Sequence, residues 1–71
     1  MRKLYTIACK DKKEKFNVFM FTGSGFVIES TIDATKGKTF NIINVDESFN
    51  TMIRFLINYY KTDYQSLLIS N

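Results

Sequence analysis

Turn-forming segments divide the first 45 residues of the chain at nearly regular intervals, and this feature constrains the fold more than any other. The segments are Asp11-Lys12-Lys13-Glu14, Gly23-Ser24-Gly25 and Thr35-Lys36-Gly37, and β-branched and aromatic residues fill the stretches between them. A spacing of about a dozen residues is typical of short antiparallel strands joined by hairpins. The pattern predicts four strands, over residues 3–10, 15–22, 26–33 and 38–45.

The register of these strands follows from the turn lengths that gather apolar residues on one face. A one-residue slip would send every side chain of a strand to the opposite face. Pairing Lys10 with Lys15, and placing three-residue loops at Gly23-Ser24-Gly25 and Thr35-Lys36-Gly37, keeps one face apolar. The predicted core face consists of Tyr5, Ile7, Cys9, Phe16, Val18, Met20, Ile28 and Ile32, joined by Phe40 and Ile42 of the last strand.

The last predicted strand fits this pattern less well than the others. Ile43 and Val45 fall on the face opposite the core, whereas Asn44 points inward. A bulge or a different register is therefore an alternative for this strand.

From Asp46 onward the apolar residues recur with the period of a helix. Asp46 is a favourable N-cap, and Glu47 in the first turn suits the helix dipole. The positions i, i+3, i+4, i+7 and i+11 form one apolar stripe, as expected for an amphipathic helix packed on a sheet. The stripe consists of Phe49, Met52, Ile53, Leu56 and Tyr60.

A second helix signal follows this stripe. Thr62-Asp63-Tyr64-Gln65 matches a capping box, so we expect a kink or a restarted short helix near Thr62, with Tyr64, Leu67 and Leu68 facing inward. The whole chain, residues 1–71, is thus predicted to form a single α+β domain. Its expected architecture is a four-stranded antiparallel β-meander packed by a C-terminal helix (ββββα).

The length and the scarcity of cysteine and histidine limit how such a domain is stabilised. A chain of 71 residues has room for one core, and Cys9 without a second Cys or any His excludes an internal disulfide and the usual zinc sites. Small domains without such links often gain burial by association, so a homodimer is expected. No stretch has the length of a signal peptide or of a membrane span of ~20 apolar residues, which predicts a cytoplasmic protein.

The side chains that ordinary enzyme chemistry needs are scarce. There is no His, and the acidic residues are scattered without a paired arrangement. Cys9 falls at an inward strand position, and Gly23-Ser24-Gly25 does not lead into a helix, so a buried apolar residue and a hairpin turn explain them better than a nucleophile and a phosphate loop. We expect no enzymatic activity, no catalytic residue, no metal and no cofactor.

Lysines gather at one end of the predicted sheet, around its first and third turns. On a chain with a net charge of +3 and a pI near 9.1, they would be able to contact several phosphates of a nucleic acid. The alternative is an ordinary solvated lysine loop. The candidate phosphate-binding residues are Lys10, Lys12, Lys13, Lys15, Lys36 and Lys38.

Apolar residues on the opposite face of the predicted sheet form a second candidate surface. Phe19 and Phe21, with Leu4 and Val27 nearby, would allow bases to stack beside the lysines, as in several single-strand binders. The alternative is that a dimer partner or a helix covers this patch. Phe55, with Ile69 on the same side, points away from the main stripe of the helix and is a candidate partner interface.

Two short segments resemble a known family. Lys36-Gly37 enters the last predicted strand, and Asn44-Val45-Asp46-Glu47-Ser48-Phe49 enters the helix. They are similar to the Lys-Gly strand start and the Asn-x-acidic helix entry of the single-stranded-DNA-binding domain of the transcriptional coactivator positive cofactor four, a Whirly-type fold. The resemblance implies four antiparallel strands and a helix, dimerisation through the helices, and binding of single strands along sheets and basic loops.

Two functions are therefore predicted for this non-enzymatic domain. The first is binding of single-stranded nucleic acid, with the lysines contacting phosphates and Phe19 and Phe21 stacking on bases. The alternative is a protein-protein interaction module, for example a small phage or mobile-element protein that inhibits or modulates a host protein complex. Its anchor would be the same Phe patch or Phe55.

Overall fold

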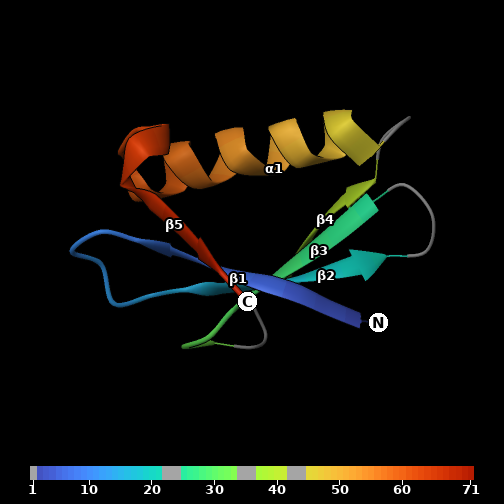
Figure 1. Cartoon of the computed structure of the whole chain (residues 1–71), viewed down its shortest axis with the longest axis horizontal. Helices are drawn as coiled ribbons and strands as arrows, with labels where there is room; N and C mark the ends of the chain where they lie inside the picture. The colour runs from blue at the N-terminus through green and yellow to red at the C-terminus, as the bar shows by residue number, and fades with distance from the viewer. Residues whose placement is uncertain (1, 22–24, 34–36, 42–44) are drawn as a thin grey trace.

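The computed structural model describes residues 2–21, 25–33, 37–41 and 45–71 of the chain, and Figure 1 shows their arrangement. A five-stranded antiparallel sheet, in the order β4-β3-β2-β1-β5, packs against one helix. The predicted α+β class is confirmed, but the sheet has one strand more than the predicted meander. The elements are β1 (Arg2–Cys9), β2 (Phe16–Phe21), β3 (Gly25–Ser30), β4 (Gly37–Asn41), α1 (Val45–Tyr60), the 3₁₀ turn η1 (Tyr64–Ser66) and β5 (Leu67–Ser70).

The strands of the first two hairpins pair two residues away from the predicted register. The predicted Lys10–Lys15 pair and the three-residue loop at Gly23-Ser24-Gly25 place Ile7 opposite Val18 and Ile28 opposite Met20. In the structure Ile7 lies opposite Phe16, and Ile28 lies opposite Val18. A two-residue shift leaves each side chain on its original face, since side chains alternate with a period of two. These residues therefore lie on their predicted faces although their predicted pairings are wrong.

The core lies between α1 and one face of the sheet. It confirms most of the predicted core face and of the predicted helix stripe. Ile32 is an exception, because β3 ends at Ser30 and leaves Ile32 67% exposed beyond the sheet. Tyr5, Met20 and Phe49 are half-buried, and Ile42 lies outside the described residues. The buried core consists of Ile7, Cys9, Phe16, Val18, Phe26, Ile28, Phe40, Met52, Ile53, Leu56, Tyr60 and Leu67.

Leu4 and the last predicted strand also differ from expectation. The pairing of β1 with β2 shifts between Lys3 and Tyr5, and such a bulge inserts one extra residue into a strand. Leu4 at this bulge packs against the core instead of lying on the opposite face. The strand predicted over 38–45 is shorter, because α1 already begins at Val45. The bulge considered near Asn44 falls outside the described residues.

A Schellman motif ends α1. The N–H of Lys61 donates to the carbonyl oxygen of Asn58 at 3.3 Å, and the N–H of Thr62 donates to that of Ile57 at 3.1 Å. Lys61 adopts a φ of 56°, the left-handed conformation that this motif needs directly after the helix cap. The helix therefore stops after Tyr60, and the chain turns back toward the sheet.

The segment after the helix is not the predicted second helix. Asp63 caps the single turn η1, where its carboxylate accepts a hydrogen bond from the N–H of Ser66. The chain then extends as β5 and pairs with β1, with Leu67 opposite Cys9. Leu67 faces inward as expected, but Leu68 and Tyr64 are 56% and 59% exposed.

The described part of the chain contains no helix that is long and apolar enough to cross a membrane.

Candidate nucleic-acid interface and adjoining cleft

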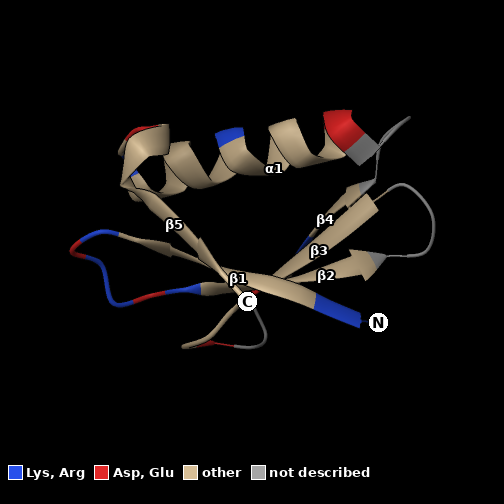
Figure 2. Ribbon diagram, viewed as in Figure 1, with Lys and Arg blue, Asp and Glu red and all other residues tan. Residues whose placement is uncertain are grey.

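The loop between β1 and β2 presents a group of predicted phosphate-binding lysines to solvent. Figure 2 shows this loop projecting from the sheet with basic and acidic residues along it. A hydrogen bond of 3.1 Å from the N–H of Lys12 to the carbonyl of Cys9 closes its turn, and Asp11 takes the left-handed conformation, with φ 65°, that Asp tolerates. The exposed lysines of this loop are Lys10, Lys12, Lys13 and Lys15.

Lys38 lies apart from these lysines, on the edge strand β4. It pairs opposite Ile28 and so lies on the helix side of the sheet. Its Nζ atom is 5.1 Å from the ring centroid of Phe55 and 5.8 Å from that of Phe40, distances at which a cation and an aromatic ring attract each other. Lys38 therefore belongs to the helix side, and Lys36 lies outside the described residues.

Phe19 lies on the open face of the sheet, the face opposite α1, because it alternates along β2 with Val18, which is buried in the core. Its cross-strand neighbours are Lys3 on β1 and Val27 on β3, and its side chain is half-buried. Phe19 is four residue steps along the chain from Lys15, about 13 Å at ~3.3 Å per residue. The lysine nearest to Phe19 in the sheet is thus Lys3, which the sequence pattern did not single out. The side chain of Phe21 lies outside what the structure describes.

Most other positions of the open face carry small or polar side chains. The hydroxyl of Thr6 donates to Oδ1 of Asn17 at 3.0 Å across the strands. Ala8 of β1 lies opposite Leu68 of the edge strand β5. Glu29 of β3 lies opposite Asn17 of β2. The face therefore combines apolar contact area around Phe19 with hydrogen-bonding groups.

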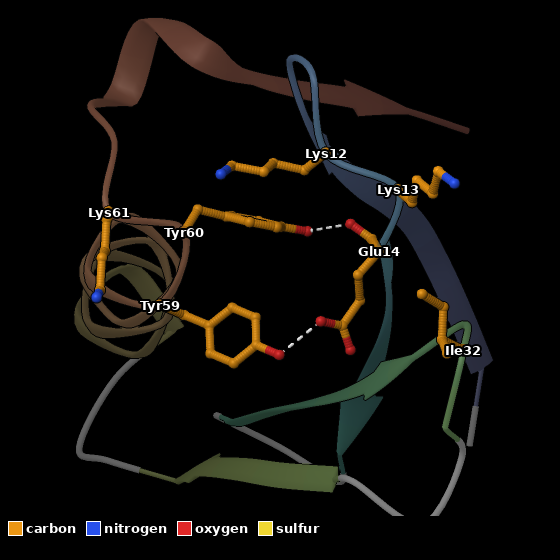
Figure 3. Close-up of a pocket in the computed structure, with 7 residues that line it drawn as sticks. All are labelled: Lys12, Lys13, Glu14, Ile32, Tyr59, Tyr60 and Lys61. Carbon is orange, nitrogen blue, oxygen red and sulfur yellow. Dashed lines mark hydrogen bonds between the residues drawn. The ribbon is translucent and has the colours of Figure 1, made fainter.

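Glu14 joins the β1–β2 loop to the helix and to the end of β3. Its Oε1 atom accepts a hydrogen bond of 2.5 Å from the hydroxyl of Tyr59, and its Oε2 atom accepts one from the hydroxyl of Ser30. Its backbone carbonyl accepts a third bond, of 2.6 Å, from the hydroxyl of Tyr60 (Figure 3). The sequence pattern placed Glu14 in a turn and assigned it no role, because its partners are distant in the sequence.

Burial and the contacts with Glu14 raise the pKa values of Tyr59 and Tyr60. The hydrogen bond to the Glu14 carboxylate, with burial and the charge of Glu14, raises the pKa of Tyr59. Burial is the main cause that raises the pKa of Tyr60, and Cys9, Glu14 and Tyr59 raise it further. Both hydroxyls therefore stay protonated, as donors, well above neutral pH.

A cleft of about 500 Å³ opens beside these hydrogen bonds (Figure 3). Lys12, Lys13 and Glu14 of the loop form one wall, together with Ile32 beyond β3. The last two residues of α1 and Lys61, which follows them, form the other wall. Lys12 points from the loop toward the helix, whereas Lys13 points away from it. The two lysines thus line the same cleft but direct their ammonium groups to different sides of the loop.

A smaller pocket of about 280 Å³ shares Tyr59 with this cleft and continues toward Lys38 and Phe55. The rings of Phe55 and Tyr59 stack with their centroids 6.0 Å apart, and Tyr59 meets Phe16 edge-on at 5.4 Å. Phe55 also packs against Phe40 of β4. The two candidate interface residues are therefore at opposite edges of the sheet, Phe55 beside β4 and Ile69 on β5.

Within the described residues, no three or more His, Cys, Asp or Glu side chains gather as a metal site would require. Cys9 is buried in the core.

Comparison of the chain with known protein families, with curated proteins and with solved structures gave no significant match.

Proposed function

We propose that this domain is a non-enzymatic module that binds single-stranded nucleic acid across the open face of its sheet and along the β1–β2 loop. The observation that carries the proposal is a sheet face that α1 leaves uncovered, with Phe19 in it and a loop of exposed lysines at its end. Stacking on an aromatic ring tolerates any base, and lysines neutralise the phosphates that follow along the strand.

The placement of charge supports this surface. Lys3 lies directly across from Phe19, so a base stacked on the ring would have a cation beside its own phosphate. The separation of about 13 Å between Phe19 and Lys15 leaves room for the strand to continue from the stacking position to the loop. The net charge of +3 favours approach of a polyanion.

Fluorescence anisotropy with a labelled single strand of about 20 nucleotides tests the proposal. Binding should weaken as salt rises from about 50 to 200 mM, because a single strand releases counterions with a log-log slope of about 0.7 per phosphate contact. Phe19→Ser should weaken binding severalfold, whereas Tyr64→Ser, which alters an exposed aromatic residue outside the open face, should not. No binding at about 50 mM salt would exclude this function.

A second candidate function is protein interaction, and β5 is the element that favours it. β5 forms an edge of the sheet, carries no charged residue, and leaves Leu68 and Ile69 56% and 46% exposed. Edge strands without charge or a covering element tend to pair with another chain. We propose a strand of a partner at this edge, either a second copy of the chain in a homodimer or a host protein.

Light scattering coupled to gel filtration tests the homodimer form of this candidate. The unaltered chain should elute as a dimer, and Leu68→Lys with Ile69→Lys should elute as a monomer. A monomer at all concentrations would exclude self-pairing, and a partner protein whose binding survives both substitutions would exclude this edge.

A further inference from the structure

The cleft between the β1–β2 loop and the end of α1 has the size and the lining of a ligand site. Its volume of about 500 Å³ lies within the range of roughly 300–1,000 Å³ that small-molecule sites occupy. Its lining combines lysines with tyrosine rings. It lies on the helix side of the loop, so it is distinct from the open face of the sheet.

The charge of the lining favours an anion. Lys12, Lys13 and Lys61 are exposed, and among the described residues that line the cleft Glu14 is the acidic one. The Glu14 carboxylate accepts hydrogen bonds from the hydroxyls of Tyr59 and Ser30 and so holds the two walls together. Lys12 points across the cleft toward the helix, so a phosphate in the cleft would meet its ammonium group, whereas the side chain of Lys61 runs along the side of the helix end away from the loop.

Tyr59 supplies an aromatic surface next to these cations. Its side chain is 42% exposed, although Phe55 stacks on it and Phe16 meets it edge-on. The hydrogen bond to Glu14 holds the ring in place before any ligand binds. A ring that is already fixed loses little entropy on stacking, which favours binding of a flat group.

We propose that this cleft holds one nucleotide of the bound single strand, with its phosphate at Lys12 and its base against Tyr59. The inference rests on the proposed nucleic-acid function and names where one nucleotide of that strand lies. Lys13 is on the same loop and points away from the helix, so it would lie beside the nucleic-acid strand where that strand leaves the cleft.

The salt dependence of strand binding tests the phosphate contacts. Lys12→Gln should weaken affinity about fivefold and lower the log-log salt slope by about 0.7, the loss of one contact. Arg54→Gln is the matched control, because it removes an exposed cation from α1 without touching the cleft. It should change affinity less than about twofold and leave the slope unchanged.

The stacking contact needs a separate measurement. Tyr59→Phe keeps the ring and should retain most of the affinity, whereas Tyr59→Leu should lose about tenfold. In a titration of the unaltered protein with thymidine monophosphate, the amide resonances of Tyr59 and Lys12 should shift together. Inorganic phosphate alone should shift Lys12 more than Tyr59.

Three outcomes separate the inference from the function on which it rests. If Lys12→Gln binds the strand as Arg54→Gln does, the cleft site is wrong while the open-face function stands. Equal affinities of Tyr59→Leu and Tyr59→Phe would exclude the base contact. If the unaltered protein binds no strand, the proposed function itself fails, and the nucleotide site fails with it.

Discussion

The hydroxyl of Tyr60 donates to the backbone carbonyl oxygen of Glu14 at 2.6 Å, and this bond connects residues that are 46 positions apart in the sequence. It ties the last turn of α1 to the loop that carries Lys12 and Lys13. With the bond from Tyr59 to the Glu14 carboxylate, it makes the position of the loop depend on the helix. The lysine-bearing loop is therefore a part of the packed fold rather than an independent appendage.

Removal of the Tyr60 hydroxyl should destabilise the domain. Tyr60→Phe keeps the buried ring but leaves the Glu14 carbonyl without that donor, which should lower the free energy of unfolding by about 1–2 kcal/mol. Urea unfolding followed by circular dichroism measures the change. Tyr64→Phe, which alters an exposed tyrosine, should stay within about 0.5 kcal/mol of the unaltered protein. Equal stability of Tyr60→Phe and the unaltered protein would mean that this bond contributes nothing.

Stability should fall at alkaline pH because of the same tyrosine. Burial raises the pKa of Tyr60 above the ordinary value of 10.0, so in the unfolded chain the hydroxyl loses its proton at a lower pH than in the fold. The unfolded state then binds fewer protons, and the free energy of unfolding decreases as pH rises above about 10. Below that pH this contribution is constant. Urea unfolding between about pH 8 and pH 11 should show a smaller decrease for Tyr60→Phe, and equal slopes would contradict the assignment to Tyr60.

The alternation of apolar residues was sufficient to assign faces but not pairings. Ile7, Val18 and Ile28 are buried on the predicted face, because a two-residue error in register does not change which side a residue faces. Ile32 was misplaced because the alternation continues past Ser30, where the strand ends. Where a strand ends depends on the pairing that its neighbours provide, and the period alone does not show it.

The capping-box pattern predicted the break near Thr62, but the Glu14 contacts were not predictable from local patterns. A helix stop is usually marked by Gly, but here Lys61 takes the left-handed position, so no glycine marks the residue at which the helix stops. Glu14 stands in a charged turn, and its partners on α1 are 45 and 46 positions away. The cleft they form depends on how α1 lies over the sheet.

Glycine at position 61 should stabilise the domain. A non-glycine residue at φ 56° carries a steric cost of roughly 1–2 kcal/mol, while glycine gives up about 0.5–1 kcal/mol in unfolded-chain entropy. Lys61→Gly should therefore raise the free energy of unfolding by about 0.5 kcal/mol and the melting temperature by about 2–4 °C. Lys13→Gly, at a loop position outside the left-handed region, should not raise it. A lower melting temperature for Lys61→Gly would contradict the strain at this position.

The neighbouring leucines of β5 distinguish the strand from the helix that the sequence predicted. In a restarted helix Leu67 and Leu68 would both face inward, and both alanine substitutions would leave cavities. In β5 they alternate: Leu67 is 9% exposed and lies opposite Cys9, whereas Leu68 is 56% exposed on the other face. Leu67→Ala should therefore lower the free energy of unfolding by about 2–3 kcal/mol, and Leu68→Ala by less than about 0.5 kcal/mol. Urea unfolding of the two variants measures this difference, and equal losses would show that β5 does not form the edge of the sheet in solution.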